Sequence, residues 1–207
     1  MQVDPEVNRL KYVQEIQRLI DQRATLEAWG IFLLSSTRFP VVELMFCPRH
    51  RLQIPVTAPP PGMNLPKGGT LALEIPNMAA RAFKAHFDLT DFDLCAPSLE
   101  FRDPWTDALL APGQMSAGLD FDQERKCYPV LLSDHPTTHK PFLCMRGIRE
   151  YHEHPQHAGD EWLLYRNDMN LFSIVRMLWR VTIDLVHPQL VLSPNAIGVQ
   201  FVCEVKP

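Results

Sequence analysis

The spacing of apolar residues changes along this chain, and these changes restrict its fold more than any other feature. Near the start, apolar residues recur every three or four positions, which predicts an amphipathic helix over about residues 5–24. Asp4 followed by Pro5 is a suitable helix start, because the carboxylate can cap the first turn and proline is tolerated at the first helical position. The apolar positions of this helix are Val7, Leu10, Val13, Ile16 and Ile20.

From Gly30 onward the helical spacing is replaced by short β-rich runs that are separated by proline or glycine. This pattern is typical of an antiparallel meander. We expect a further strand over Phe83 to Leu89 and a long surface loop or insertion over residues 103–127, which are rich in Pro, Gly, Asp and Ala. The expected strands of the meander cover residues 31–34, 41–46, 52–56 and 70–75.

A second helical pattern and a final strand close the sequence. Asn167 or Asp168 can cap a helix that ends near His187. The last segment alternates apolar and other residues from Ile197 to Val205, as a half-buried strand does. The whole pattern predicts an α+β fold in one domain, 1–207, with helices packed against an antiparallel sheet. The expected apolar stripe of the second helix is Leu171, Ile174, Val175, Leu178, Val181 and Leu185.

Charge and cysteine content exclude several classes of protein. The formal net charge is -4, and no Lys/Arg-rich block is present, which argues against a nucleic-acid-binding protein. The start of the chain lacks the apolar core of a signal peptide, and no apolar run approaches the ~18 residues of a membrane span. The 5 cysteines are odd in number and widely spaced, so we expect reduced thiols in a cytoplasmic protein.

Histidines gather in one region of the chain. Of the 8 histidines, His135, His139, His152, His154 and His157 lie close together with Cys144 among them. Imidazole and thiolate are the ligands that Zn²⁺ prefers, and a carboxylate oxygen can complete a tetrahedron. The segment 144–157 is therefore a candidate zinc site, although ligand type alone also allows copper, nickel or iron. The simpler interpretation is a solvated polar loop.

The spacing within 144–157 supplies more ligands than one ion needs. If residues 150–154 are extended, Glu150, His152 and His154 project to the same side. Cys144 would then approach across a turn at Gly147, and we rank Cys144, Glu150 and His152 first as ligands. The remaining candidates, His154 and His157, compete for the fourth place or support the other ligands.

Cys144 also allows a different chemistry. His135 and Pro136 lie shortly before it, and such an arrangement suits a nucleophilic cysteine that accepts an acyl group. A zinc-bound thiolate has its charge committed to the metal, so the two roles largely exclude each other. A third interpretation is a zinc hydrolase, with Glu150 or Glu153 as the general base.

The segment from Cys144 to His157, followed by Trp162-Leu-Leu-Tyr-Arg166, resembles the predicted metal-binding CEHH family. That family is named for a cysteine, a glutamate and two histidines, and it occurs in bacterial gene neighbourhoods that encode ubiquitin-like proteins with their activating, conjugating and deconjugating enzymes. The resemblance implies that Cys144 and Glu150 are ligands, together with two of the three histidines. It leaves open which two of His152, His154 and His157 they are.

The wider chain also resembles the ubiquitin-conjugating-enzyme fold, with its N-terminal helix, β-meander and post-cysteine helix. His135-Pro136, with Cys144 nine residues later, is similar to the His-Pro-Asn motif and catalytic cysteine of that fold. Thr137, however, replaces the asparagine expected to stabilise an oxyanion, and the spacing is one residue short. Losing such a donor typically costs ~100 to 1,000-fold in rate.

The histidine cluster and these resemblances together imply a zinc-binding, conjugating-enzyme-like accessory protein, and the resemblance to the CEHH family implies a bacterial ubiquitin-like modification pathway that serves in defence against phage. We expect its partners to be the ubiquitin-like protein or its activating and conjugating enzymes, and neither nucleic acid nor membrane. The alternatives are an active conjugating enzyme that carries the modifier as a thioester on Cys144, and a zinc-dependent hydrolase.

Overall fold

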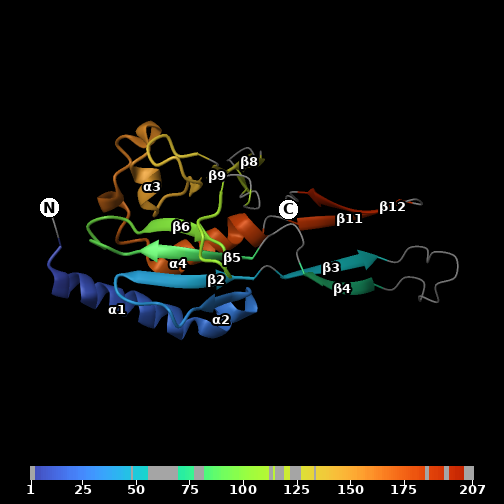
Figure 1. Cartoon of the computed structure of the whole chain (residues 1–207), viewed down its shortest axis with the longest axis horizontal. Helices are drawn as coiled ribbons and strands as arrows, with labels where there is room; N and C mark the ends of the chain where they lie inside the picture. The colour runs from blue at the N-terminus through green and yellow to red at the C-terminus, as the bar shows by residue number, and fades with distance from the viewer. Residues whose placement is uncertain are drawn as a thin grey trace.

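The structure is a computed structural model of the whole chain, shown in Figure 1. Parts of four sequence predictions lie outside the described residues: the end of the strand 52–56, parts of the loop 103–127, Leu185 in the second helix and the end of the last strand. The described residues are 3–47, 49–55, 70–76, 82–111, 114, 119–121, 127–132, 134–184, 187–193 and 196–202.

The chain begins with helix α1, Pro5–Asp21, followed by helix α2, Arg23–Ala28. The predicted cap is confirmed, because the Asp4 carboxylate accepts a hydrogen bond from the amide of Glu6 at 2.8 Å. The predicted helix of residues 5–24 is interrupted near its end, where α1 gives way to α2.

The orientation of α1 differs from the orientation that its pattern predicts. Its apolar positions are largely exposed, with Leu10 at 65% and Val13 at 55%. The buried face instead contains polar groups that have specific partners. Glu15 accepts a hydrogen bond from the amide of Leu171 at 2.7 Å, and the Tyr12 hydroxyl donates to the carbonyl of Val41 at 3.0 Å. The polar face of α1 is therefore buried because its side chains form hydrogen bonds with the rest of the fold, which the apolar pattern alone does not predict.

A four-stranded antiparallel sheet forms the centre of the molecule, in the order β1-β2-β5-β6. Within the predicted meander, the antiparallel pairing of β1 with β2 is confirmed. The separately predicted strand over Phe83 to Leu89 is confirmed as β5, and β6 was not predicted. The other two strands of the predicted meander, β3 and β4, pair only with each other among the described residues. The strands of the sheet are β1 (Ile31–Leu33), β2 (Val41–Phe46), β5 (Phe83–Asp88) and β6 (Ser98–Arg102), and the separate hairpin is β3 (Arg49–Pro55) with β4 (Thr70–Pro76).

The second long helix packs as its sequence predicts. Helix α4, Leu171–Trp179, continues as a π-helical segment, Arg180–Asp184, and lies behind the sheet in Figure 1. The predicted caps at Asn167 and Asp168 are wrong, because Asn170 accepts the capping hydrogen bond from the amide of Ser173. The apolar stripe of α4 is buried in one core with the sheet, and this core includes Leu171, Ile174, Val175, Leu178, Val42, Leu44, Ala85, Phe87 and Phe101.

Short elements connect the sheet to α4. The expected loop 103–127 contains a strand, since β7 (Leu119–Phe121) pairs with β8 (Cys127–Pro129). The connection continues through β9 (Leu131–Leu132), β10 (Phe142–Leu143), α3 (Arg149–His152) and two 3-10 helices, Pro155–His157 and Trp162–Leu164.

The chain ends in a further hairpin, β11 (His187–Ser193) with β12 (Ala196–Val202). The predicted last strand is thus confirmed over β12, and β11 was not predicted. Mixed helices and antiparallel strands confirm the α+β class. Among the described residues, no helix is both long and apolar enough to cross a bilayer.

Candidate functional site

The predicted site segment lies between β10 and the 3-10 helix Pro155–His157. The backbone amide of Cys144 donates to the carbonyl of Val130 at 2.7 Å, which continues the pairing of β10 with β9. Gly147 then turns the chain at a φ of +91°, and an added Cβ there would lie 2.7 Å from the side chain of Met169. This turn needs glycine both for its backbone angle and for the close approach.

Cys144 and His157 are brought together by this turn. The thiol Sγ of Cys144 lies 3.3 Å from Nε2 of His157, and both side chains are half-buried. Burial raises the pKa of the Cys144 thiol. Burial, followed by the nearby His154 ring, lowers the pKa of His157. Both groups are therefore held in their neutral forms near neutral pH, as a thiol beside an imidazole.

His154 lies next to this pair. Its ring centroid is 5.4 Å from that of His157 and 5.7 Å from that of Phe142, on which it stacks. Nδ1 of His154 accepts a hydrogen bond from the amide of Gln156 at 3.2 Å. In this arrangement the proton of the neutral ring is on Nε2.

His152 has the opposite tautomer. Its Nδ1 lies 2.6 Å from the carbonyl oxygen of Asp160, to which it donates a hydrogen bond. Its Nε2 therefore keeps a lone pair, whose partner is the amide of Gly147 at 3.4 Å. Donation from one ring nitrogen to a backbone carbonyl is typical of a metal-ligating histidine, because it fixes the tautomer of the other nitrogen.

Glu150 lies in different surroundings from those predicted. The expected extended conformation of residues 150–154 is wrong, because residues 149–152 form the helical turn α3. The Glu150 carboxylate accepts hydrogen bonds from the Ser98 hydroxyl and from the amide of Leu99, the latter at 3.2 Å. Burial raises the pKa of Glu150 and outweighs the opposing effect of these bonds. The structure thus brings Cys144 and His157 together and directs Glu150 to the sheet.

The physical cause of this difference is the anchoring of α3 to the segment before β6. The amide of Arg149 donates to the carbonyl of Pro97 at 2.9 Å, and its guanidinium donates to the carbonyls of Ala96 and Thr90. These contacts, between residues far apart in the sequence, favour a helical turn whose first residues face β6. The local sequence from Arg149 onward does not reveal them.

Asp160 is a site residue that sequence reasoning missed. Its carboxylate accepts hydrogen bonds from the Tyr151 hydroxyl at 2.5 Å and from Nε of Arg146 at 3.0 Å. Hydrogen bonds from Tyr151, then Tyr165 and then Arg146 bring the pKa of Asp160 to about 2. The Tyr151 ring in turn stacks on His157 at a centroid distance of 3.9 Å. Asp160 therefore helps to position His157, and no pattern around it in the sequence indicates this.

His135 is part of the core rather than of an open site. Its side chain is 0% exposed, and Nδ1 accepts hydrogen bonds from the amides of Thr137 and Thr138, each at 3.2 Å. Its Nε2 donates to the carbonyl of Glu150 at 3.0 Å. Both ring nitrogens are thus occupied by the backbone. His139, by contrast, is exposed, and its Nδ1 lies 3.3 Å from the carboxylate of Asp134.

The predicted ligands do not all converge on one point in this conformation. Within the part of the chain that the structure describes, no three His, Cys, Asp or Glu side chains are close enough together to hold a metal ion. What is present is a sulfur and nitrogen pair with two further imidazoles nearby.

Comparison with known proteins finds a similarity over this segment. Residues 122–186 match the family model named Y4jH-like, which describes the Y4jH family. The uncharacterized protein y4jH of Sinorhizobium fredii is 29% identical to this chain over 182 residues, which cover 79% of this chain and 75% of the relative. The chain is therefore similar to the Y4jH family, and the match includes Cys144, His157 and Asp160.

Proposed function

We propose that this chain is a zinc-binding, conjugating-enzyme-like accessory protein of a bacterial ubiquitin-like modification pathway. The observation that carries the metal part of the proposal is the contact between Cys144 and His157. In tetrahedral zinc sites with Zn–S of ~2.3 Å and Zn–N of ~2.0 Å, a sulfur and a nitrogen ligand lie about 3.5 Å apart. The 3.3 Å between Cys144 Sγ and His157 Nε2 is close to that separation.

The neighbouring histidines supply the further ligands. His152 already donates through Nδ1 to the carbonyl of Asp160, so its Nε2 suits a metal without a change of tautomer. His154 would have to give up the hydrogen bond from Gln156 or change its ring orientation, since its Nδ1 is the acceptor. We therefore rank Cys144, His157 and His152 first, and His154 after them.

Glu150 fits the metal less well than the pattern suggests. Its carboxylate would have to leave Ser98 and Leu99 to become a ligand. Leaving these donors unpaired costs about 1–3 kcal/mol for each buried group. Glu150 accordingly serves better as the anchor of α3 on the sheet than as a fourth ligand.

The bound ion would act as a structural metal. Zinc held by residues at both ends of the segment would close a loop and contribute folding free energy. The proposal assigns no reaction to the metal. The turn and the helix that it would stabilise then form a fixed surface next to β6, which suits a binding platform rather than a catalyst.

The conjugating-enzyme-like part rests on the order of the elements. An N-terminal helix, a four-stranded antiparallel sheet, a cysteine and then a helix packed on the core follow one another in the chain, in the order that the resemblance implies. The assignment to a ubiquitin-like pathway, and to phage defence, rests on the resemblance of segment 144–157 to the CEHH family.

The metal content of protein purified without an affinity tag tests the proposal. We expect about one equivalent of zinc per chain, as structural sites hold, and loss of that zinc in His157→Ala. The exposed neighbour His139→Ala is the matched control and should keep the metal. Less than about a tenth of an equivalent of any transition metal in the wild type would contradict a structural site.

The same contact supports a second candidate function. A thiol within about 3.3 Å of an imidazole is also the arrangement of a nucleophile with its base, so Cys144 can be considered as an acyl carrier. Incubation with the activating enzyme, ATP and the ubiquitin-like modifier distinguishes the two functions. A reducible adduct that Cys144→Ser abolishes would support the carrier, and its absence together with bound zinc would support the accessory role.

A further inference from the structure

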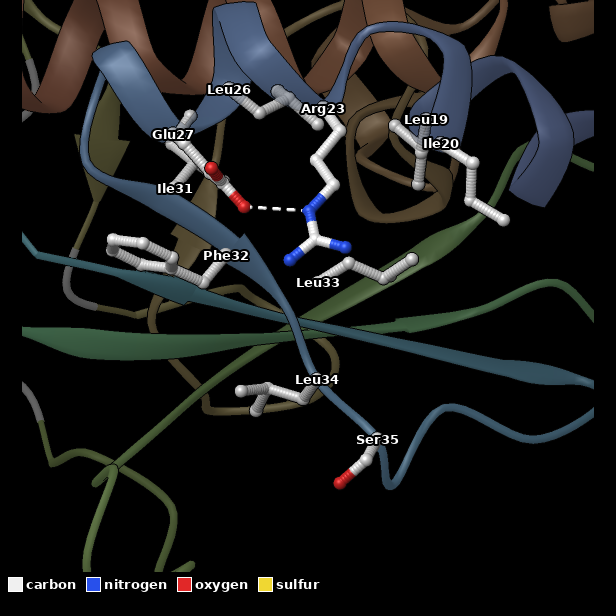
Figure 2. A pocket seen from close by; sticks show the side chains of 10 residues that line it. All are labelled: Leu19, Ile20, Arg23, Leu26, Glu27, Ile31, Phe32, Leu33, Leu34 and Ser35. Carbon is white, nitrogen blue, oxygen red and sulfur yellow. Dashed lines mark hydrogen bonds and ion pairs between the residues drawn. The ribbon is translucent and has the colours of Figure 1, made fainter.

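A groove on the opposite side of the molecule from β6 has features that suit a peptide. It lies between strand β1 and the helices α1 and α2, and its cavity has a volume of about 400 Å³. Figure 2 shows the side chains that line it, with the helices on one side and the strand on the other. Most of the lining is apolar and includes Leu19, Ile20, Leu26, Ile31 and Leu33.

One wall of the groove is the outer edge of the sheet. Strand β1 pairs with β2 on one side only among the described residues. The carbonyl of Gly30 accepts from the amide of Cys47, and the amide of Leu34 donates to the carbonyl of Glu43. The backbone N–H and C=O groups of the even-numbered residues from Gly30 to Leu34 therefore point toward β2. In an antiparallel strand the residues between them point their backbone groups away from that partner.

One of these outward-facing residues is accessible. Ile31 is 0% exposed, but Leu33 is half-buried. In the part of the chain that the structure describes, the outward backbone groups of Leu33 have no hydrogen-bond partner. Unpaired groups of this kind are a template for an extended chain.

An ion pair between Arg23 and Glu27 also lines this groove. Nε of Arg23 donates to the Glu27 carboxylate at 2.6 Å, and the Arg23 side chain is 77% exposed. Figure 2 shows that the guanidinium extends from the helix toward β1, near Leu33. Its two terminal nitrogens have no hydrogen-bond partner among the described residues. A guanidinium with free terminal nitrogens matches a carboxylate, which it can bind through two parallel bonds.

We propose that this groove binds an extended peptide segment of a partner protein, by strand addition to β1. Each feature determines one property of the occupant. The strand edge requires an extended backbone, the apolar cavity takes a hydrophobic side chain, and Arg23 takes an acidic side chain next to it. The proposal is independent of the metal site, because none of its residues belongs to segment 144–157.

The exposed apolar face of α1 extends this surface. Ile20 lines the groove and is 47% exposed, and Val13 and Leu10 continue along the same helix at 55% and 65%. A partner that inserts a strand into the groove can therefore also cover apolar surface on α1. This gives the unexpected orientation of α1 a role in binding.

Panning a phage-displayed library of random decapeptides against the full chain tests the proposal. We expect the selected sequences to combine a bulky apolar residue with Asp or Glu one or two positions away. A synthetic copy of a selected peptide should bind Arg23→Gln at least ~10-fold more weakly than the wild type, as the loss of a charge-assisted bond predicts. Arg9→Gln, which changes an exposed arginine of α1 outside the groove, should bind as the wild type does.

A second measurement tests strand addition itself. The same peptide, methylated at alternate backbone nitrogens, should lose binding in one of the two alternations, because only one set of amides faces β1. The amide NMR signal of Leu33 should shift on addition of the unmethylated peptide. Equal affinity for wild type and Arg23→Gln, retained binding of both methylated forms, or failure to select any peptide would each overturn the proposal. A dimer in solution that Arg23→Gln dissociates would also overturn it, since a second copy would then occupy the groove.

Discussion

The two sides of helix α3 differ in how fully their polar groups are bonded. On the side of β6, the Glu150 carboxylate accepts from Ser98 and Leu99, and both ring nitrogens of the nearby His135 are bonded to the backbone. On the other side, Sγ of Cys144 lies 3.3 Å from Nε2 of His157, and a further imidazole lies beside them. The bonds on the first side hold the turn in place. The atoms on the second side still have lone pairs that can coordinate a metal.

This difference separates two roles that the sequence presents as one cluster. Residues with complete hydrogen bonding contribute to stability, and their replacement should destabilise the fold without changing a ligand's affinity directly. Replacement of residues with available lone pairs should instead lower the affinity for a ligand and leave the stability of the ligand-free protein nearly unchanged.

The largest expected effect is on stability, in His135→Ala. The change leaves a cavity and removes the partners of the amides of Thr137 and Thr138 and of the carbonyl of Glu150. We expect the free energy of unfolding to fall by about 3 kcal/mol, measured by urea denaturation of the metal-free protein. His139→Ala, in the exposed turn, should change it by less than about 0.5 kcal/mol. Equal effects of the two changes would contradict the structural role of His135.

The next effect is on metal affinity, in Asp160→Asn. Asp160 holds Tyr151, whose ring stacks on His157, so its replacement should loosen a ligand without removing one. Zinc affinity should fall by ~10 to 100-fold, as is typical when a group that supports a ligand is lost. A competition titration with a chelator measures this. Tyr151→Phe, which keeps the stacked ring but loses the hydroxyl, should give a smaller decrease than Asp160→Asn.

A matched pair of variants tests whether Glu150 stabilises the fold or binds the metal. Glu150→Gln should lower the free energy of unfolding by about 1 kcal/mol and leave the zinc content unchanged, because its partners are Ser98 and Leu99. His157→Ala should lose the zinc and leave the stability of the metal-free protein nearly unchanged. If Glu150→Gln also lost the metal, Glu150 would be a ligand and the ranking given above would be wrong.

The smallest effect is a difference in pH dependence between the two carboxylates. Burial raises the folded-state pKa of Glu150 above its ordinary 4.5, so the folded state binds the proton more tightly and the protein gains stability as the pH falls through that raised value. Asp160 has a pKa of about 2 against an ordinary 3.8, so its contribution to stability is present above about 3.8 and is lost as the pH falls toward 2. Urea denaturation at several pH values should therefore show slopes of opposite sign for Glu150→Gln and Asp160→Asn, each relative to the wild type. Slopes of the same sign would contradict these environments.

The sequence predicts where helices form better than which face they bury. In α4 the apolar stripe and the buried face coincide, so the periodicity is sufficient. In α1 the predicted apolar positions are largely exposed, because Tyr12 and Glu15 turn toward hydrogen-bonding partners in β2 and α4. Those partners are distant in the sequence, and periodicity contains no information about them.

The candidate site shows the same limit. The cluster of histidines around Cys144 is visible in the sequence, and the structure pairs Cys144 with His157. The separation of Glu150 from that pair depends on contacts between α3 and residues 96–99, which local spacing cannot show. Asp160 lacks a recognisable motif, and its role appears only from its bonds to Tyr151 and Arg146.

X-ray absorption at the zinc edge of the purified, untagged protein reports the atoms bound to the metal, and therefore tests whether Cys144 and His157 hold it. We expect one sulfur ligand at ~2.3 Å and at least two nitrogen ligands at ~2.0 Å, with the sulfur contribution lost in Cys144→Ser. A spectrum with bound zinc but only oxygen and nitrogen ligands, or with a sulfur contribution that persists in Cys144→Ser, would contradict a site built on Cys144 and His157.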